Sequence, residues 1–158
     1  MSLPLVFNPL QSALRELQIE EILQTNPAAA PYGLTLTVAD AADIIEARNQ
    51  VLQGYGRIEL DTAVTRKIIA GFCASPYVAP EDYAATIREV QEIFYYLKNE
   101  TADQLGDNEL IAVLRDSFDN ACGGSLELLQ ETAFEILAGK LRRVRLSNPW
   151  TGEGEDGR

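Results

Sequence analysis

Two pairs of carboxylates have the residue types and the spacing that metal chemistry requires. Glu89 and Glu92 stand three positions apart, and Asp116 and Asp119 repeat that spacing further along the chain. Carboxylate oxygens are the ligands that Mg²⁺ prefers, and a bound Mg²⁺ can activate water for hydrolysis. Two such pairs on neighbouring helices would therefore form a hydrolytic centre if they faced each other.

The outline of these pairs resembles the metal site of all-helical nucleotide pyrophosphohydrolases. The fuller acidic pattern of those enzymes is missing, and an ideal helical wheel directs both pairs away from the apolar faces of their helices. Solvated faces are the favoured interpretation. A magnesium-dependent hydrolase that uses Glu89, Glu92, Asp116 and Asp119 remains the alternative.

The absence of histidine excludes most other catalytic sets. With no imidazole in the sequence, there is no Ser-His-Asp triad, no Cys-His dyad and no histidine-ligated zinc. The two cysteines, Cys73 and Cys122, lie far apart and form no CxxC pair. We interpret both as reduced, buried, small apolar residues, and we expect no cofactor.

The glycine loop in FDNACGGSLELL, residues 118–129, could hold a phosphate or form a corner between two helices. Gly123 or Gly124 can take the left-handed conformation that ends a helix, and Ser125 can cap the next one. The P-loop pattern is absent, and no lysine or arginine lies between Arg115 and Lys140. The corner is the favoured interpretation.

Proline, glycine and capping residues divide the chain into helices. Asn8 with Pro9 starts one, Thr37 with Asp40 makes a capping box for another, and Pro80 opens the most strongly amphipathic one. The pattern predicts six helices, over residues 9–25, 38–54, 62–72, 80–97, 108–121 and 126–144. RIEL, residues 57–60, alternates polar and apolar residues and suggests a short extended segment.

These elements predict an all-α fold, a bundle-like domain over residues 1–146 followed by an acidic, glycine-rich tail over residues 147–158. The chain of 158 residues is 46% hydrophobic and carries a net charge of −11. Residues 1–139 hold 8 basic and 21 acidic side chains, so we expect no nucleic-acid partner. The basic cluster KLRRVR, residues 140–145, would complement the dipole at a helix end.

No apolar run is long enough to cross a membrane, and the start of the sequence lacks the basic residues of a secretory signal. We therefore expect a cytoplasmic protein without a membrane partner.

Several short motifs, taken together, are similar to the pattern of a known protein family. YGRIEL, SPY, LKNE after EIFYY, DNELI and CGGSLELL, within residues 55–129, resemble the pattern of an uncharacterised bacterial family known only as a domain of unknown function. The resemblance implies no activity, cofactor or catalytic residue.

Aromatic residues on the outer side of the helix that follows Pro80 suggest an interaction surface. The wheel directs Tyr95 and Tyr96 away from the principal apolar face, and Leu128 lies among glutamates on a later helix. Packing within the molecule and binding of a partner both explain such residues. We expect a non-enzymatic protein-interaction or self-associating module, with a homodimer as its simplest form.

Overall fold

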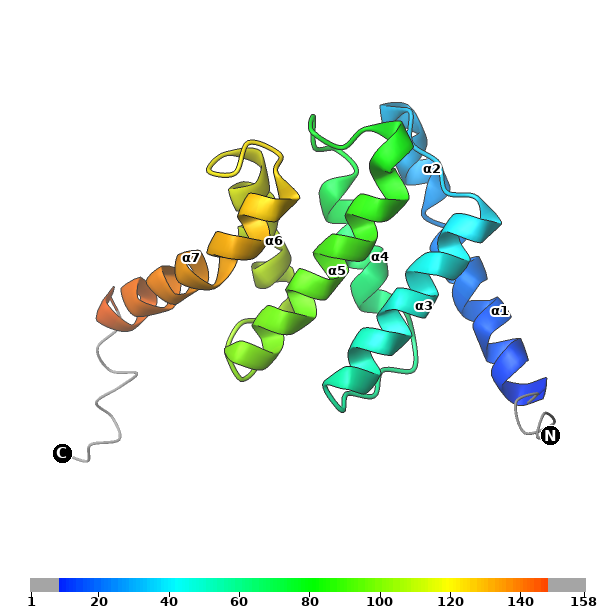
Figure 1. Cartoon of the computed structure of the whole chain (residues 1–158), viewed down its shortest axis with the longest axis horizontal. Coiled ribbons are helices and arrows are strands. Elements are labelled where there is room, and N and C mark those ends of the chain that lie inside the picture. Colours follow the sequence, from blue (N-terminus) through cyan, green and yellow to red (C-terminus); the bar gives the residue numbers. More distant parts are fainter. Residues whose placement is uncertain (1–8, 148–158) are drawn as a thin grey trace.

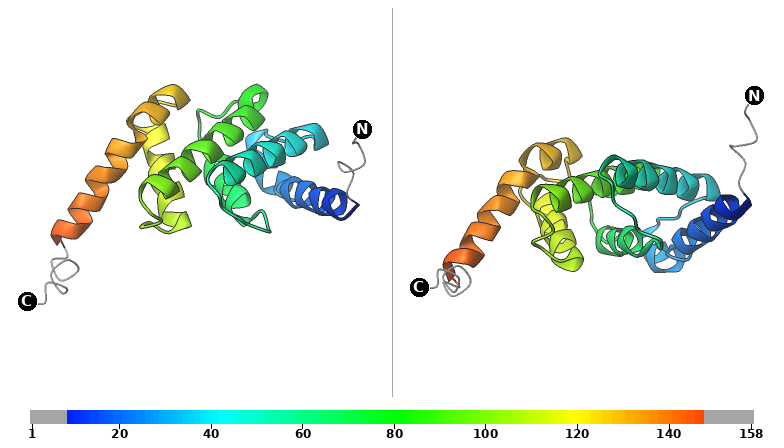
Figure 2. Two further views of the ribbon diagram at one scale, coloured as in Figure 1. Left: turned by 60° about the horizontal axis from the view of Figure 1, so that its bottom comes forward. Right: turned by 90° about the horizontal axis from the view of Figure 1, so that it is seen from below.

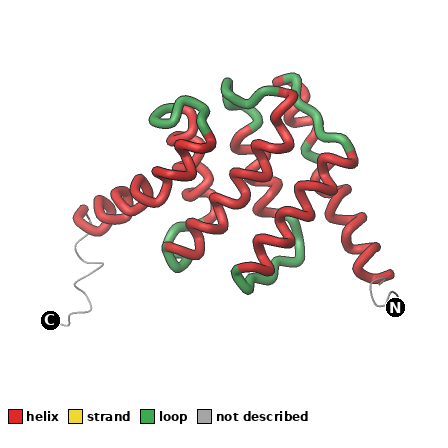
Figure 3. Tube along the Cα trace, viewed as in Figure 1, coloured by secondary structure: helices red, strands yellow, loops and turns green. Residues whose placement is uncertain are grey.

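The computed structural model describes the backbone of residues 9–147, and most of it is helical. Six helices have ten or more residues: α1 (Pro9–Leu23), α3 (Val38–Gly54), α4 (Ala63–Phe72), α5 (Tyr83–Glu100), α6 (Asp107–Asp119) and α7 (Leu126–Ser147). Three short helical turns lie in the connections: α2 (Asn26–Ala29), η2 (Ala30–Tyr32) and η3 (Pro80–Asp82). The described residues contain no strand (Figure 3), so the predicted all-α fold of six helices is confirmed.

Local capping explains where several helices begin. Thr37 and Asp40 form the predicted capping box, each side chain accepting from the other's backbone N–H at 3.0 Å. The Asp61 carboxylate accepts from the backbone of Ala63 at 3.0 Å, at the start of α4. The predicted ends are close to the observed ones, although α1 ends at Leu23 and α7 continues to Ser147. RIEL forms no strand and belongs to the loop between α3 and α4.

The long helices pair along the chain, and the pairs stand in a row (Figure 1). α1 contacts α3, α4 contacts α5, and α6 contacts α7. Neighbouring pairs meet through α3, α5 and α7 in one layer and through α1, α4 and α6 in the other (Figure 2). α1 is thus at one end of the row, and the second half of α7 projects from the other end.

The core runs between the two layers and includes one polar link. Its largest apolar side chains, each at most 1% exposed, include Phe72, Phe94 and Phe118. Gln91 on α5 is fully buried; its Oε1 accepts from the Thr65 hydroxyl at 2.5 Å, and its Nε2 donates to the Ile44 carbonyl at 3.3 Å. This hydrogen-bonded side chain ties α3, α4 and α5 together without leaving a buried polar group unpaired.

The glycine loop is the predicted corner between α6 and α7. Gly123 and Gly124 both have left-handed backbone conformations, with φ of 57° and 83°. The Ser125 hydroxyl accepts from the backbone of Leu128 at 3.1 Å and caps α7. Cys122 is buried beside the corner, as predicted. Of the predicted tail, Ser147 ends α7 and residues 148–158 lie outside the described range.

Candidate functional site

Tyr95, which the helical wheel directs away from the principal apolar face of α5, lies in the interior. It is 0% exposed, its hydroxyl donates to Glu59 Oε1 at 2.6 Å, and its ring meets Phe94 edge-on with the centroids 5.1 Å apart. Burial raises the pKa of Tyr95 far above its usual value, and the hydrogen bond to Glu59 adds to this rise. The prediction that Tyr95 faces a partner is wrong, because the loop that carries Glu59 reaches this side of α5.

Tyr96, by contrast, is 41% exposed and lines a surface groove of about 750 Å³. We call this the tyrosine groove. It lies across α3, α5 and α7, and it is lined by Val51, Tyr55, Arg88, Glu89, Glu92, Ile93, Tyr96 and Gln130. Leu128 is 38% exposed but is not among the lining residues. The exposed tyrosines of this groove are therefore Tyr55 and Tyr96, whereas Tyr95 is buried.

Two of the four predicted metal-binding acids belong to this groove. Glu89 and Glu92 are exposed, and neither side chain makes a hydrogen bond or an ion pair with any residue in the described part of the chain. Arg88 beside them is likewise unpaired within that part. The groove therefore carries two carboxylates whose charge no neighbouring side chain neutralises by direct contact.

The other two acids have structural roles on α6. Asp119 Oδ2 accepts from Arg115 Nε at 2.6 Å, while its Oδ1 accepts from the Ser75 hydroxyl at 2.7 Å. The Asp116 carboxylate accepts from the Asn120 side chain at 2.9 Å. Asp119 thus joins α6 to the segment after α4.

The magnesium site of the alternative interpretation is not formed among the described residues. Across residues 9–147, no three Asp, Glu, Cys or His side chains gather closely enough to hold a metal ion. The acids of α5 line the tyrosine groove, and those of α6 bond to their own helix and to Ser75. Within the described residues, these four acids therefore do not form one metal site, because their helices do not direct them toward a common point.

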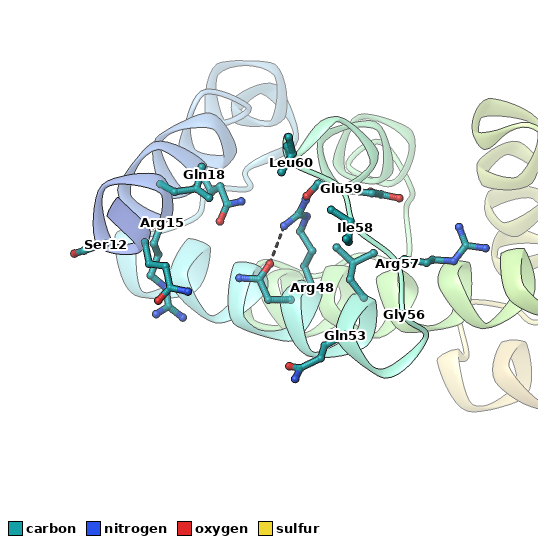
Figure 4. Close-up of a pocket in the computed structure, with 14 residues that line it drawn as sticks. Ser12, Arg15, Gln18, Arg48, Gln53, Gly56, Arg57, Ile58, Glu59 and Leu60 are labelled. Atoms are coloured by element: carbon teal, nitrogen blue, oxygen red, sulfur yellow. Dashed lines mark hydrogen bonds between the residues drawn. The ribbon is translucent and has the colours of Figure 1, made fainter. Parts of the chain in front are cut away.

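A second hollow, of about 840 Å³, lies between α1, α3 and the loop before α4 (Figure 4). We call it the amide pocket, because side-chain amides are the most numerous kind among its polar residues. It is lined by Gln11, Ser12, Leu14, Arg15, Gln18, Arg48, Asn49, Leu52, Gln53, Gly56, Arg57, Ile58, Glu59 and Leu60. Sequence reasoning did not single out any of these residues as a site.

Arg48 forms the floor of the amide pocket. It is 1% exposed, and its guanidinium donates to Asn49 Oδ1 at 2.7 Å and to the Glu59 and Asp61 carbonyls at 2.6 and 2.7 Å. Its Nε is buried without a hydrogen-bond partner, and no carboxylate of the described residues forms an ion pair with it. Arg48 therefore brings a buried positive charge that direct contact with an acid does not offset.

The other two arginines of the amide pocket are already paired. Arg15 forms an ion pair with Glu46, and Arg57 Nη2 lies 2.5 Å from Asp103. Figure 4 shows the Arg57 guanidinium directed away from the pocket. Bonding to Arg57 lowers the pKa of the Asp103 carboxyl. The charge available to the pocket is therefore that of Arg48.

The comparisons identify a family but no activity. A family model, described as Family of unknown function (DUF6323), matches residues 21–146. The searches of curated proteins and of solved structures found no significant match. Among the described residues, no helix combines the length and the apolar character needed to span a membrane.

Proposed function

The chain belongs to this family of unknown function, which brings no activity with it, and we propose that it is a non-enzymatic protein-interaction module that self-associates through the tyrosine groove. The observation that carries the proposal is the placement of Glu89 and Glu92, unpaired within the described residues, beside the exposed Tyr96. Acids and an aromatic ring in one groove suit a partner segment that is both basic and apolar.

The floor and walls of the groove supply the apolar part of such an interface. Ile93 is 5% exposed at its base, while Tyr55 and Tyr96 are 37% and 41% exposed. Tyrosine is enriched at protein interfaces because it combines a large rigid ring with a polar end. A partner that covered both rings would bury apolar area and leave each hydroxyl at the rim.

A second copy of the chain supplies a segment of matching charge. Lys140, Arg142 and Arg143 lie on the half of α7 that projects beyond the body (Figure 1), and both arginines are exposed. The rest of the chain is strongly acidic, with 21 acidic and 8 basic residues over 1–139. Because opposite charges on one surface favour association between copies, the basic end of α7 is the occupant we propose for the groove.

Reversal of charge on each side tests the pairing. In light scattering at low salt, the wild type should be an oligomer. Glu89→Lys with Glu92→Lys should be monomeric, as should Arg142→Glu with Arg143→Glu. Mixing the two double variants should restore a complex, because each now presents the charge that the other lacks, and added salt should weaken the wild-type oligomer. A monomeric wild type at 100 µM, or no complex in the mixture, would refute the pairing.

Tyr96→Ala and Leu128→Ala form a matched pair on neighbouring helices, since the two side chains are similarly exposed. Only Tyr96 lines the groove. We therefore expect Tyr96→Ala to weaken association by about tenfold or more and Leu128→Ala to leave it unchanged. The opposite result would place the interface on the other side of α7.

A further inference from the structure

Besides Arg48, the amide pocket contains a buried polar side chain that has no hydrogen-bond partner among the described residues. Gln18 on α1 is 5% exposed, and its amide makes no hydrogen bond to any residue of the described range. Figure 4 shows this amide directed across the pocket toward Arg48. Buried amides in proteins are usually hydrogen-bonded, so a free one facing a hollow points to a ligand or to water.

Asn49 provides a second amide donor. Because Arg48 donates to Oδ1 of Asn49, the Nδ2 donor of the same amide remains available, and no described residue accepts from it. The pocket thus combines the donors of Gln18 and Asn49 with the positive charge of Arg48. Such a set favours an anion, whose oxygens accept from the amides and whose charge offsets the buried guanidinium.

The number of unpaired cations limits the charge of that anion. Arg15 and Arg57 are engaged with Glu46 and Asp103, so among the residues that the structure describes the pocket has one cation to offer. A carboxylate, with a single charge, matches it. A phosphate dianion would bring a second charge into a chain whose net charge is already −11.

The rim of the pocket indicates what the carboxylate is attached to. Leu14, Ile58 and Leu60 line the pocket and are 41%, 87% and 76% exposed. Large apolar side chains that are exposed together usually mark a contact surface. An aliphatic chain that extended from the pocket floor would cover them.

We propose that the amide pocket binds a small organic acid, with its carboxylate at the amides of Gln18 and Asn49 above Arg48 and its aliphatic body against Leu14, Ile58 and Leu60. This site is separate from the tyrosine groove, and it does not depend on self-association. The proposed binding site for organic acids thus lies at the end of the row that α1 and α3 form.

Titration of the full chain with sodium hexanoate, followed by ¹H–¹⁵N NMR, tests the site. Hexanoate should shift the side-chain amide signals of Gln18 and Asn49. Hexanamide has the same body without the charge, and inorganic phosphate has charge without the body. Both should bind at least about tenfold more weakly than hexanoate, because hexanamide lacks the charge that Arg48 attracts and phosphate lacks the aliphatic chain that covers the rim.

Substitution of Gln18 provides a second readout. Gln18→Leu keeps the side-chain size and removes the donor, so hexanoate affinity should fall about tenfold. Gln53→Leu alters an exposed residue that also lines the pocket, and affinity should stay within twofold. Circular dichroism checks that both variants fold. Equal binding of hexanamide, tighter binding of phosphate, or unchanged affinity in Gln18→Leu would overturn the proposal.

Discussion

Two tyrosines of α5 bury their hydroxyls in contrasting surroundings. Tyr95 donates to Glu59 at 2.6 Å, whereas the hydroxyl of Tyr83 is buried with no partner among the described residues. A hydrogen bond to a charged acceptor contributes about 1.5 to 3 kcal/mol. We therefore expect Tyr95→Phe to lower the free energy of unfolding by about 2 kcal/mol in urea titrations. Tyr83→Phe, the matched control, should not lower it, and an equal loss in both would contradict the assigned bond.

The same residue, Tyr83, predicts how stability responds to alkali. Burial raises the pKa of Tyr83 to about 12, and the nearby Cys73 adds to the rise. An unfolded tyrosine ionises at about pH 10. Between about pH 10 and 12 the unfolded chain loses a proton that the folded chain keeps, so stability falls as pH rises.

Tyr83→Phe removes this ionisation and should make the alkaline decline shallower. Thermal unfolding at several pH values from 8 to 12 measures it. The wild type and the variant should run parallel below pH 9.5 and diverge above it. Parallel curves throughout would show that Tyr83 ionises equally in both states.

At the residue level, the side chains that cap helices could be predicted from the sequence, whereas the burial of a charged residue such as Arg48 was not predicted. Thr37 and Ser125 act within one helical turn, so their neighbours in the sequence determine their contacts. The position of Arg48 did contain a signal, because it stands in the apolar series of Ala41, Ile45 and Leu52 at helical spacing. A charged residue on such a stripe indicates a buried polar contact.

Among the connecting elements, the corner between α6 and α7 depends on Gly124. A Cβ built there would lie 2.4 Å from Tyr77 Cγ and 2.6 Å from its Cβ, and φ is 83°. Gly123 has φ of 57°, but a Cβ there would meet nothing within 4 Å. A side chain at Gly123 would therefore add backbone strain alone, whereas one at Gly124 would add both backbone strain and overlap with Tyr77.

Gly123→Ala should cost about 1 to 2 kcal/mol, from the left-handed backbone alone. Gly124→Ala should cost at least about 3 kcal/mol, because Tyr77 must also move and give up its edge-on contact with Phe118. Urea unfolding of both variants measures the difference. Equal losses would show that Tyr77 moves aside without cost.

Helices and their ends could be predicted because periodicity and caps are local. The loop over residues 55–62 could not, because its position depends on partners far away in the chain. Its Glu59 bonds to Tyr95 on α5, and its Arg57 bonds to Asp103 after α5. A wheel drawn for α5 alone leaves Tyr95 without cover, which is why that residue was a candidate for partner binding as well as for packing within the molecule.

On the scale of the whole molecule, the row of helix pairs leaves its two ends with neighbours on one side only. The first pair holds the amide pocket, and the last pair extends into the basic half of α7. Among residues 126–143 of α7, whose side chains the structure describes, Leu129, Ala133 and Leu137 are buried, and none of residues 138–143 is. The body thus supports the first half of α7, while residues 138–143 depend more on the hydrogen bonds of the helix itself.

Hydrogen–deuterium exchange should show this division and should also report on self-association. In dilute protein, amides of α7 after Leu137 should exchange much faster than those of α5, because a helix without packed side chains opens easily. As concentration rises, protection should increase after Leu137 and around Tyr96 together, since the two surfaces cover each other in the proposed assembly. Arg142→Glu with Arg143→Glu, the matched control, should remove the concentration dependence and leave α5 protected. If protection of the α7 end were high in dilute protein, or did not change with concentration, this segment would be stabilised by its own chain rather than by a second copy.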